Sequence, residues 1–549
     1  MTKNFIYWWI TAALAVFAYL YSLDGMHIPS TGDEGPYLQI TRLTAANGHW
    51  LPLQPAEGLG VTKPPLLFWQ GIVASNWGQN WDLWRFRLPI VGYTFLTSFM
   101  VFWFTRRISG DTESAAIAGV AFLAFTSIFH HGRPFITNLP EVFFLTLSYF
   151  LFVLYRKSSS NYRLWLGLGV LVGLSAWVRS IFLLAPVGLA FCIYLLWQQQ
   201  WSIVKFLKHD APRLTVFTLT VLAVFGLWFL IDPKPEAIVQ EFLLGENVSK
   251  LSVEGGYWKN FFSGPYPVFA VWLGIFRNAG FLALPLFYVS FVSLKNWKSL
   301  SNEVQMLWLW ILAFIIVFTV PAQRQDSYVL ATMPAVAVIL GLHWRNIPRA
   351  GFYLFILPLL LIFAGLIYLM IPISQHVLPA GAYAPWHYLA PFGGLALAVL
   401  ALAYNKWSPR MFIGLIFLAY LAFASVVAPL EGPLGRFDAQ AISSVAGKTV
   451  YVPSNFRSQY ERYRFLLPGA EIRSYEYGDD ATRDRLLAAG EILVADLPPE
   501  ANSFESYRVL GSRLTVRSRM PQEEIPLVLK KQRMELLFRR ELLLQGRDP

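Results

Sequence analysis

Membrane-length apolar runs recur along this chain up to about Ala428 and constrain its fold more than any other feature. A helix needs about 20 apolar residues to cross the hydrocarbon core of a bilayer. Because 56% of the residues are hydrophobic and only 14% are charged, we expect lipid to be the main solvent of the chain. The sequence therefore predicts an α-helical polytopic membrane protein. About thirteen spans are expected, near residues 5–23, 86–105, 114–130, 136–155, 164–178, 180–198, 214–231, 268–294, 305–322, 328–342, 351–371, 388–404 and 410–428.

Lysine and arginine residues gather at every second connection between these runs and predict the orientation of the chain. Clusters of this kind face the cytoplasm in membrane proteins. The N-terminus is then cytoplasmic, whereas the loops at about 24–85 and 232–267 and the region after residue 430 are extracytoplasmic. We interpret the net charge of +11 as a sign of this topology and of contact with anionic membrane lipids. No basic-aromatic array indicates nucleic-acid binding. The clusters are Arg106-Arg107, Arg156 with Lys157 and Arg163, Lys205 with Lys208 and Arg213, Lys295 with Lys298, Arg345 with Arg349, and Lys406 with Arg410.

The composition changes after about residue 430, where charged residues begin to alternate with short apolar runs. This change predicts two domains, a transmembrane domain over 1–430 and a soluble extracytoplasmic α/β domain over 431–549. The tail contains neither a glycine-rich phosphate loop nor a nucleophile elbow, so we expect an accessory domain that caps a site or contacts a substrate. The expected strands are 449–453, 492–496, 507–510 and 514–517, and the expected helices lie near 460–467, 481–489 and, with a basic face, 529–544.

Two adjacent carboxylates, Asp33 and Glu34, follow the first apolar run directly. Charges at the mouth of a helix bundle are a poor membrane anchor, but they can hold a base or a cation over a membrane-embedded substrate. Thr31 or Asp33 can cap a helix that ends at Asn47, and a second helix is expected to begin at Pro64. Two helices that lie flat on the membrane would place the carboxylates near its outer surface.

The first external loop also carries a succession of motifs that is similar to a known family. The succession is Asp33-Glu34, Tyr37, Arg42, Lys63-Pro-Pro-Leu-Leu-Phe-Trp69 and Arg85-Phe-Arg87-Leu-Pro. It resembles the bacterial GT-C membrane glycosyltransferases, and among them the aminoarabinose transferase and protein mannosyltransferase-like group. The resemblance covers the architecture over most of the chain and the motifs over about residues 30–180.

The resemblance implies a multi-pass enzyme of the cell inner membrane with about thirteen spans and a small external α/β domain. Such an enzyme is a hexosyl- or pentosyltransferase that takes a sugar from a polyprenyl-phosphate donor on the outer face of the membrane. The acceptor would be lipid A, another envelope glycan or a protein hydroxyl, and one-step transfer would invert the anomeric centre. Within the first-loop motifs, Tyr37 and Arg42 are then candidate contacts to the donor or the acceptor.

Two positions depart from the family's pattern. The family's second carboxylate is the aspartate of an Arg-x-x-x-Thr-Asp-x-Pro pattern. In this chain the pattern begins at Arg133, and Asn138 stands in the position of the aspartate. Glu141 is the nearest carboxylate, about one helical turn away, so either Glu141 substitutes or the enzyme uses one acid. The family's lysine after the fifth span is replaced by Arg179, which keeps the charge and can bind phosphate through two hydrogen bonds.

Later segments match the family less closely. The stretch around Glu246 resembles a Glu-His-x-x-Arg motif, with Asn247 where the histidine would be. In some members that histidine binds a metal together with an acid that is Thr62 here, so a divalent metal is an open question and no cofactor is certain. Arg324 and Tyr328 resemble the basic-aromatic stretch that closes the lipid-carrier site, although a short solvated turn would look the same.

The chemistry can also be argued from the residues. Transfer from a polyprenyl-phosphate sugar needs a cationic clamp for the phosphate, a carboxylate that takes the acceptor proton, and an apolar groove for the isoprenoid. Lys63, Arg133 and Arg179 are cations expected at the outer boundary, where they would stabilise charge that develops on phosphate. Asp33 is the expected general base, and Glu34 beside it is expected to share the catalytic role or to orient the loop. The alternative for the two arginines is contact with lipid headgroups.

Two other functions stay open. A transporter or flippase would place its ionisable residues near the middle of the bilayer, whereas the charges here gather at one outer surface. An O-antigen polymerase or ligase would share the lipid-linked donor and differ by transferring longer glycans. The mass of the transferred unit separates the second alternative from a single-sugar transferase.

Overall fold

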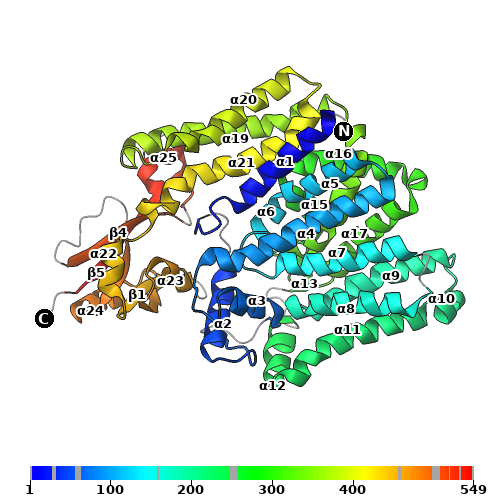
Figure 1. Cartoon of the computed structure of the whole chain (residues 1–549), viewed down its shortest axis with the longest axis horizontal. Coiled ribbons are helices and arrows are strands. Elements are labelled where there is room, and N and C mark those ends of the chain that lie inside the picture. The colour runs from blue at the N-terminus through cyan, green and yellow to red at the C-terminus, as the bar shows by residue number, and fades with distance from the viewer. Residues whose placement is uncertain are drawn as a thin grey trace.

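The computed structural model describes residues 3–27, 32–55, 63–156, 160–247, 256–454, 459–497, 507–517, 520–530 and 533–546. It shows a helical bundle with a small sheet domain at one end (Figure 1). The helices of the bundle are α1 (Lys3–Leu20), α4 (Leu83–Ser109), α5 (Thr112–Ala124), α6 (Thr126–His131), α7 (Asn138–Tyr155), α8 (Tyr162–Val178), α9 (Leu184–Gln198), α10 (Ile203–His209), α11 (Ala211–Ile231), α12 (Pro235–Ala237), α13 (Tyr257–Phe262), α14 (Phe269–Trp272), α15 (Gly274–Ala279), α16 (Ala283–Lys295), α17 (Asn302–Thr319), α18 (Met333–His343), α19 (Gly351–His376), α20 (Leu389–Ala403) and α21 (Ser408–Glu431).

The helices coincide with the predicted apolar runs and confirm the polytopic membrane fold. Among the described residues, 10 helices are long and apolar enough to cross a membrane. The runs predicted near 5–23, 114–130 and 164–178 contain shorter apolar helices over Ile6–Leu20, Thr112–Ala124 and Tyr162–Val178. The count of thirteen spans therefore stays a prediction.

The connection between α4 and α5 shows how the sequence sets the helix ends. Arg106 and Arg107 lie in the last turn of α4, where positive charge suits the negative end of the helix dipole. Gly110 follows with φ of 71°, a left-handed conformation that costs a glycine little. Asp111 then accepts hydrogen bonds from the amides of Glu113 and Ser114 and caps α5.

Two short helices form the first external loop, where the sequence predicted them. They are α2 (Glu34–Ala46) and α3 (Leu66–Ala74). The ring of Tyr37 on α2 meets the ring of Phe68 on α3 edge to face, with centroids 5.9 Å apart. Figure 1 shows α2 and α3 on the part of the bundle that faces the sheet domain, with α10 at the opposite end.

The C-terminal domain is built on a mixed five-stranded sheet with strand order β2-β1-β3-β5-β4. Strand β1 pairs in parallel with β2 and β3, whereas β5 pairs antiparallel with both β3 and β4. A sheet with short helices confirms the predicted α/β type. The elements are α22 (Ala439–Val445), β1 (Thr449–Ser454), α23 (Tyr463–Leu466), β2 (Glu471–Glu476), α24 (Asp480–Ala488), β3 (Ile492–Leu497), β4 (Arg508–Val516), α25 (Ile525–Leu529) and β5 (Phe538–Gln545).

Two sequence predictions for this domain were wrong. The strands predicted at 507–510 and 514–517 are one strand, β4, with an irregularity between Val509 and Gly511. The basic helix predicted near 529–544 is wrong from Phe538 onward, where the chain forms strand β5 with Phe538, Glu541 and Leu543 buried. The pairing of β5 with a neighbour on each side outweighs the helical propensity of its leucines and arginines.

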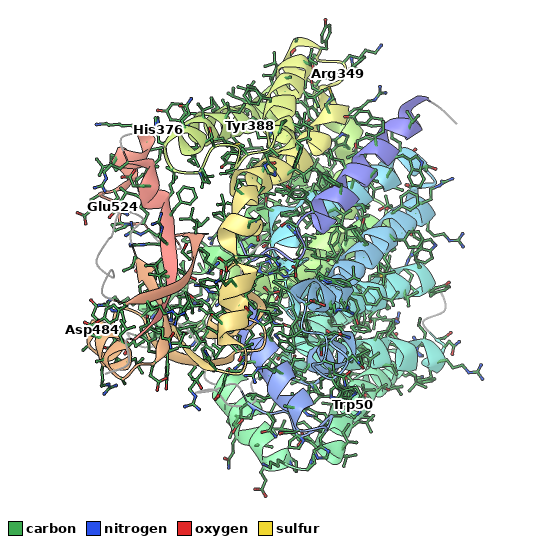
Figure 2. The ribbon with its side chains drawn as sticks, turned by 60° about the vertical axis from the view of Figure 1, so that its left-hand side comes forward. Trp50, Arg349, His376, Tyr388, Asp484 and Glu524 are labelled. Carbon is green, nitrogen blue, oxygen red and sulfur yellow. The ribbon has the colours of Figure 1, made fainter. Side chains whose placement is uncertain are left out.

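The sheet domain packs on the ends of α19 and α21. Met370 and Ile373 of α19 form an apolar cluster with Val528, Met534 and Phe538 of the C-terminal domain. Figure 2 shows Asp484 and Glu524 on the outer side of that domain, at the left of the view, with the helices of the bundle to its right. The C-terminal domain thus has one face against the bundle and another in solvent.

Candidate functional site

The loop at residues 24–85 presents the carboxylate of Asp33 to solvent. Asp33 immediately precedes α2, its side chain is exposed, and it makes no capping hydrogen bond to the helix amides. Tyr37, one turn further along α2, is buried and lies within electrostatic reach of Arg179. The start of α2 therefore places an accessible carboxylate in the same region as a predicted phosphate ligand.

The neighbouring carboxylate, Glu34, is buried and fully engaged. Its Oε1 and Oε2 atoms accept hydrogen bonds from Nε and Nη2 of Arg87 at 2.8 and 2.7 Å. Oε1 also accepts from the backbone amide of Phe135 at 2.8 Å. Glu34 is 7% exposed and Arg87 is 1% exposed. The structure thus gives Glu34 a role in joining α2, α4 and the segment before α7, and it leaves Asp33 as the accessible acid of the pair.

Two buried arginines bind the end of the first helix. Arg87 donates from Nη1 to the carbonyls of Leu23 and Gly25 at 3.0 and 2.6 Å. Arg133 donates from Nη2 to the carbonyls of Tyr21 and Ser22 at 2.5 and 3.2 Å. Arg133 is 1% exposed and neutralises carbonyls at the end of α1, and its role in binding the donor phosphate stays a prediction.

Glu141 and Arg179 form an ion pair between the start of α7 and the end of α8. Nη1 of Arg179 lies 2.8 Å from Oε2 of Glu141. The Glu141 side chain is 6% exposed, whereas that of Arg179 is 23% exposed. Asn138, one turn before Glu141, is buried at the start of α7. The carboxylate nearest to the family's second acidic position therefore holds a half-buried cation in place.

A second group of ionisable residues, which includes His131, lies beside the Glu141–Arg179 pair. His131 donates from Nδ1 to the carbonyl oxygen of Ser127 at 2.8 Å. Burial, together with the nearby His130 and the charge of Arg179, lowers the pKa of His131 to about 4, so its imidazole is neutral at physiological pH.

Asp326 also lies within reach of His131, and it forms a loose ion pair with Arg277 at 3.5 Å between Oδ2 and Nε. The Arg277 side chain is 60% exposed and can turn toward an anion. Tyr328 lies within electrostatic reach of Arg179. The Glu141–Arg179 pair and the Asp326–Arg277 pair thus border the same region, with His131 between them.

The other predicted site residues either have partners within the protein or lie outside the part of the chain that the structure describes. Arg324 is 1% exposed, donates to the carbonyls of Thr319 and Tyr266 at 2.8 and 3.2 Å, and lies over two aromatic rings. Arg42 is paired with a glutamate of the C-terminal domain. Lys63 is partly buried and has interactions of its own. The side chain of Glu246, like Thr62, lies outside the described residues.

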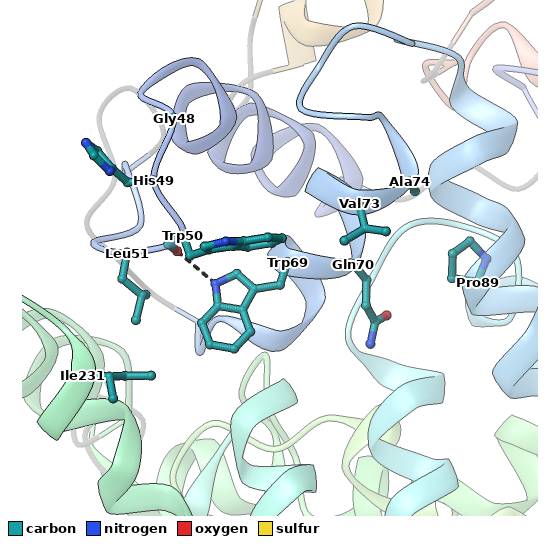
Figure 3. A pocket seen from close by; sticks show the side chains of 10 residues that line it. All are labelled: Gly48, His49, Trp50, Leu51, Trp69, Gln70, Val73, Ala74, Pro89 and Ile231. Carbon is teal, nitrogen blue, oxygen red and sulfur yellow. Dashed lines mark hydrogen bonds between the residues drawn. The ribbon is translucent and has the colours of Figure 1, made fainter.

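An apolar pocket of about 950 Å³ opens beside the first-loop helices. In Figure 3 Trp69 of α3 and Trp50 form one wall, Ile231 of α11 faces them, and the Gln70 side chain extends from α3 into the space. Nε1 of Trp69 donates to the carbonyl of Trp50 at 2.9 Å. Val73 on the same helix is 68% exposed, so the apolar surface continues outward from the pocket.

Metal ligands do not gather in the described part of the chain. No group of three or more His, Cys, Asp or Glu side chains there could hold a metal ion. The adjacent His130 and His131 rings lie 4.9 Å apart at 90° to each other. The site as described is thus made of carboxylates, guanidiniums and aromatic rings.

Sequence reasoning gave no role to two residues of this region. Arg87 stands at the start of an apolar run, within the quoted motif Arg85-Phe-Arg87-Leu-Pro. Arg277 is the only charged residue inside the apolar run predicted at 268–294. An ionisable residue within a membrane-length run is a signal of function, and it could have identified both residues.

Comparisons with known proteins agree with this architecture. Residues 9–234 match the family described as dolichyl-phosphate-mannose-protein mannosyltransferase. The crystal structure of ArnT from Cupriavidus metallidurans bound to undecaprenyl phosphate has a similar fold, with a TM-score of 0.64, 15% sequence identity, and coverage of 98% of this chain and 97% of that chain.

Curated relatives match over part of their length. An uncharacterized protein of Aquifex aeolicus is 25% identical over 62% of this chain and 63% of its own length. The undecaprenyl phosphate-alpha-4-amino-4-deoxy-L-arabinose arabinosyl transferase of Edwardsiella ictaluri is 21% identical over 62% of this chain and 59% of its own length. The fold of this chain is thus that of the ArnT structure, and its N-terminal part is similar to the mannosyltransferase family and to an aminoarabinose transferase.

Proposed function

We propose that this protein is a glycosyltransferase that moves a sugar from a polyprenyl-phosphate donor to an acceptor of the cell envelope. The acceptor is lipid A, another glycan or a protein hydroxyl, and the reaction takes place on the outer face of the inner membrane. The observation that carries the proposal is the exposed carboxylate of Asp33 at the start of α2, in the same region as the half-buried cation Arg179. The similarity to a lipid-phosphate-binding ArnT supports the donor class.

Asp33 acts as the general base in this proposal. Its carboxylate takes the proton of the acceptor hydroxyl while the hydroxyl oxygen attacks the anomeric carbon of the sugar. The bond from the anomeric carbon to the phosphate oxygen breaks, and polyprenyl phosphate leaves with one more negative charge than it had as a diester. A single displacement of this kind inverts the anomeric centre.

The cations stabilise the charge that develops on the leaving phosphate. Arg179 is held by Glu141, yet part of its side chain stays exposed. Lys63 precedes α3 on the loop that also carries Asp33. Arg277 adds a more exposed guanidinium, held only loosely by Asp326. In a partly dehydrated site each of these contacts is stronger than it would be in water. A divalent metal, if one is used, would add to the same stabilisation.

The apolar pocket beside α3 suits the isoprenoid part of the donor. Its walls are mainly aromatic and aliphatic, and its volume of about 950 Å³ is large enough for several isoprene units. The clusters of lysine and arginine at alternate connections support a cytoplasmic N-terminus and a periplasmic C-terminal domain. The donor would then enter from the outer leaflet, at the depth where α3 meets lipid.

Comparison of envelope masses with and without the gene tests this proposal. Loss of one sugar mass from a lipid, a glycan or a protein, restored by the wild-type gene and not by Asp33→Asn, is the expected result. Loss of a long glycan would instead indicate a polymerase or ligase. An unchanged envelope, or a lipid-linked sugar that accumulates on the cytoplasmic face alone, would overturn the proposal in favour of transport.

A further inference from the structure

The C-terminal domain holds the middle of α2 through a buried ion pair. Arg42 donates from Nε and Nη2 to the carboxylate of Glu461, with distances of 3.2 and 2.7 Å. The Glu461 side chain is 0% exposed and also accepts from Nε of Arg464 at 3.1 Å. Glu461 is thus a buried carboxylate shared by two guanidiniums, one from each domain.

A second contact lies on the same face of α2. Gln39 donates from its side-chain amide to the hydroxyl of Tyr460, the residue before Glu461. Gln39 and Arg42 are three residues apart, so they lie side by side on one face of the helix. Two successive residues of the C-terminal domain therefore bind two neighbouring positions of α2.

Contacts on both sides of α2 complete this seam between the domains. Arg436 pairs with Asp24 at 2.9 Å before the helix, and Phe465 stacks on Trp81 after it, with ring centroids 5.9 Å apart. Nε2 of His27 lies 3.3 Å from Oγ1 of Thr515. The domain is therefore attached to the loop at several points, and two of them lie on α2, the helix that directly follows Asp33.

The position of Asp33 depends on both ends of this short helix. α2 contains 13 residues and is about 20 Å long, so it moves as a rigid rod. The ion pair of Glu34 fixes its first turn to the bundle, and the ion pair of Arg42 fixes its third turn to the C-terminal domain. A rod held at only one point can pivot, and a pivot displaces the carboxylate at its start.

We propose that Glu461 is a positioning residue, through which the C-terminal domain holds α2 so that Asp33 meets the acceptor hydroxyl. This inference rests on the proposed function, in which Asp33 is the base. Glu461 touches neither substrate and acts only through Arg42. The role of the C-terminal domain is then to fix the geometry of a site formed by the membrane domain.

Charge reversal tests the proposal. The purified full-length variants Arg42→Glu, Glu461→Arg and the double variant are assayed with a polyprenyl-phosphate sugar. Each single change is expected to lower kcat about 10²-fold with little effect on the donor KM, because a displacement of about 1 Å is enough for such a loss. The double variant restores an ion pair of opposite polarity between α2 and the C-terminal domain and is expected to recover part of the kcat, since Arg464 then lies beside a second guanidinium.

Full activity of Glu461→Arg would overturn the proposal, because it would show that the ion pair does not position the base. If Arg42→Glu and the double variant are inactive in that case, Arg42 itself binds a substrate. Should charge reversal prevent folding, Glu461→Gln replaces it, and the same fall in kcat at unchanged KM is expected.

A distance measurement separates this inference from the proposed function. Spin labels are placed at the exposed Asn47, directly after α2, and at the exposed Asp484, in a Cys192→Ser background that removes the single native cysteine. Glu461→Arg is expected to broaden the distance distribution, and the double variant is expected to narrow it again. Unchanged distributions contradict the positioning role, even if no sugar transfer is observed in the wild type.

Discussion

The carboxylate of Glu34 and the guanidinium of Arg87 form a buried pair joined by two hydrogen bonds, of 2.8 and 2.7 Å. Because both oxygens of Glu34 are engaged and the side chain is buried, proton transfer would first require this pair to break. The adjacent Asp33 carries no such restraint and is exposed. Burial thus gives Glu34 a structural role and leaves Asp33 as the accessible acid, as the proposed general base requires.

We expect Asp33→Asn to lower kcat about 10²- to 10⁴-fold, the usual scale for loss of a general base. Its thermal midpoint should match the wild type, because an exposed side chain without a capping hydrogen bond contributes little to stability. Initial rates with a polyprenyl-phosphate sugar and a melting curve in detergent measure the two effects. A variant that keeps near wild-type kcat would remove Asp33 as the base.

The matched control is Glu34→Gln at the next position. Removal of one partner of a buried ion pair leaves the other charge unpaired and costs about 3–5 kcal/mol of stability. We therefore expect Glu34→Gln to lower the thermal midpoint clearly, in contrast to Asp33→Asn. An unchanged midpoint would mean that the pair with Arg87 contributes little, and Glu34 would return as a candidate base.

The pair of Glu141 and Arg179 should act as one unit in donor binding. Arg179→Ala is expected to raise the donor KM, whereas Arg179→Lys keeps the charge and should be tolerated better. Glu141→Gln releases the guanidinium and should also raise the donor KM. Since the two residues are in contact, the double variant Glu141→Gln/Arg179→Ala should be no worse than Arg179→Ala alone.

Kinetics of these four variants decide between two roles of Glu141. If Glu141→Gln lowers kcat on the scale of a lost base and leaves the donor KM unchanged, Glu141 is the second catalytic acid. Unchanged donor kinetics in Arg179→Ala would make that arginine a contact to lipid headgroups and leave Lys63 and Arg277 as the candidate phosphate ligands.

A charged side chain introduced into the apolar pocket should weaken binding of donors that have a long polyprenyl chain. Val73 lines the pocket and is 68% exposed, so Val73→Asp should fold while it places a charge where the isoprenoid would lie. We expect a higher KM for a long polyprenyl donor and an unchanged KM for a short, soluble analogue. Val204→Asp on α10, where the valine is 76% exposed, is the control. Equal effects on both donors would assign the pocket to another ligand.

His131 should make the stability of the protein depend on pH. Its pKa is about 4 in the fold, against 6.5 for an unperturbed histidine, so the unfolded chain binds the proton first as the pH falls. The stabilisation is complete above about pH 6.5 and is lost as the pH falls toward 4, by about 3 kcal/mol in total. His131→Gln should therefore lose less of its thermal midpoint than the wild type between about pH 7 and about pH 5. If the thermal midpoints of His131→Gln and the wild type fall equally over this pH range, His131 is not the source of the pH dependence.

Much of the fold could be predicted because its signals are local. Apolar runs long enough to span a bilayer gave the helices of the bundle, and Pro64 together with Pro65 indicated the start of α3. Strand β5 was missed because its pattern, Phe-Arg-Arg-Glu-Leu-Leu-Leu-Gln, also fits a helix. Only its two neighbouring strands, which lie far from it in sequence, decide between the two structures.

The candidate site was predicted less completely, since burial and pairing are set at long range. Residue type and position alone did not distinguish Asp33 from Glu34, because the partner of Glu34 lies on α4. Arg133 and Arg324 were expected to bind phosphate or donor, yet the carbonyls they contact become available only when helix ends meet in the fold. The charges were found from the sequence, whereas their partners required the structure.

The place of β5 in the sheet has a consequence for biosynthesis. β5 lies between β3 and β4, so the ribosome must release the whole of β5 before the sheet can close. Glu541 on this strand receives hydrogen bonds from Arg462, Tyr463 and Arg513, and Arg462 directly follows the residue that holds α2. The helices up to α21 leave the ribosome much earlier. A nascent chain can therefore occupy the membrane before the C-terminal domain holds α2, and under the proposed function it would transfer no sugar until β5 has joined the sheet.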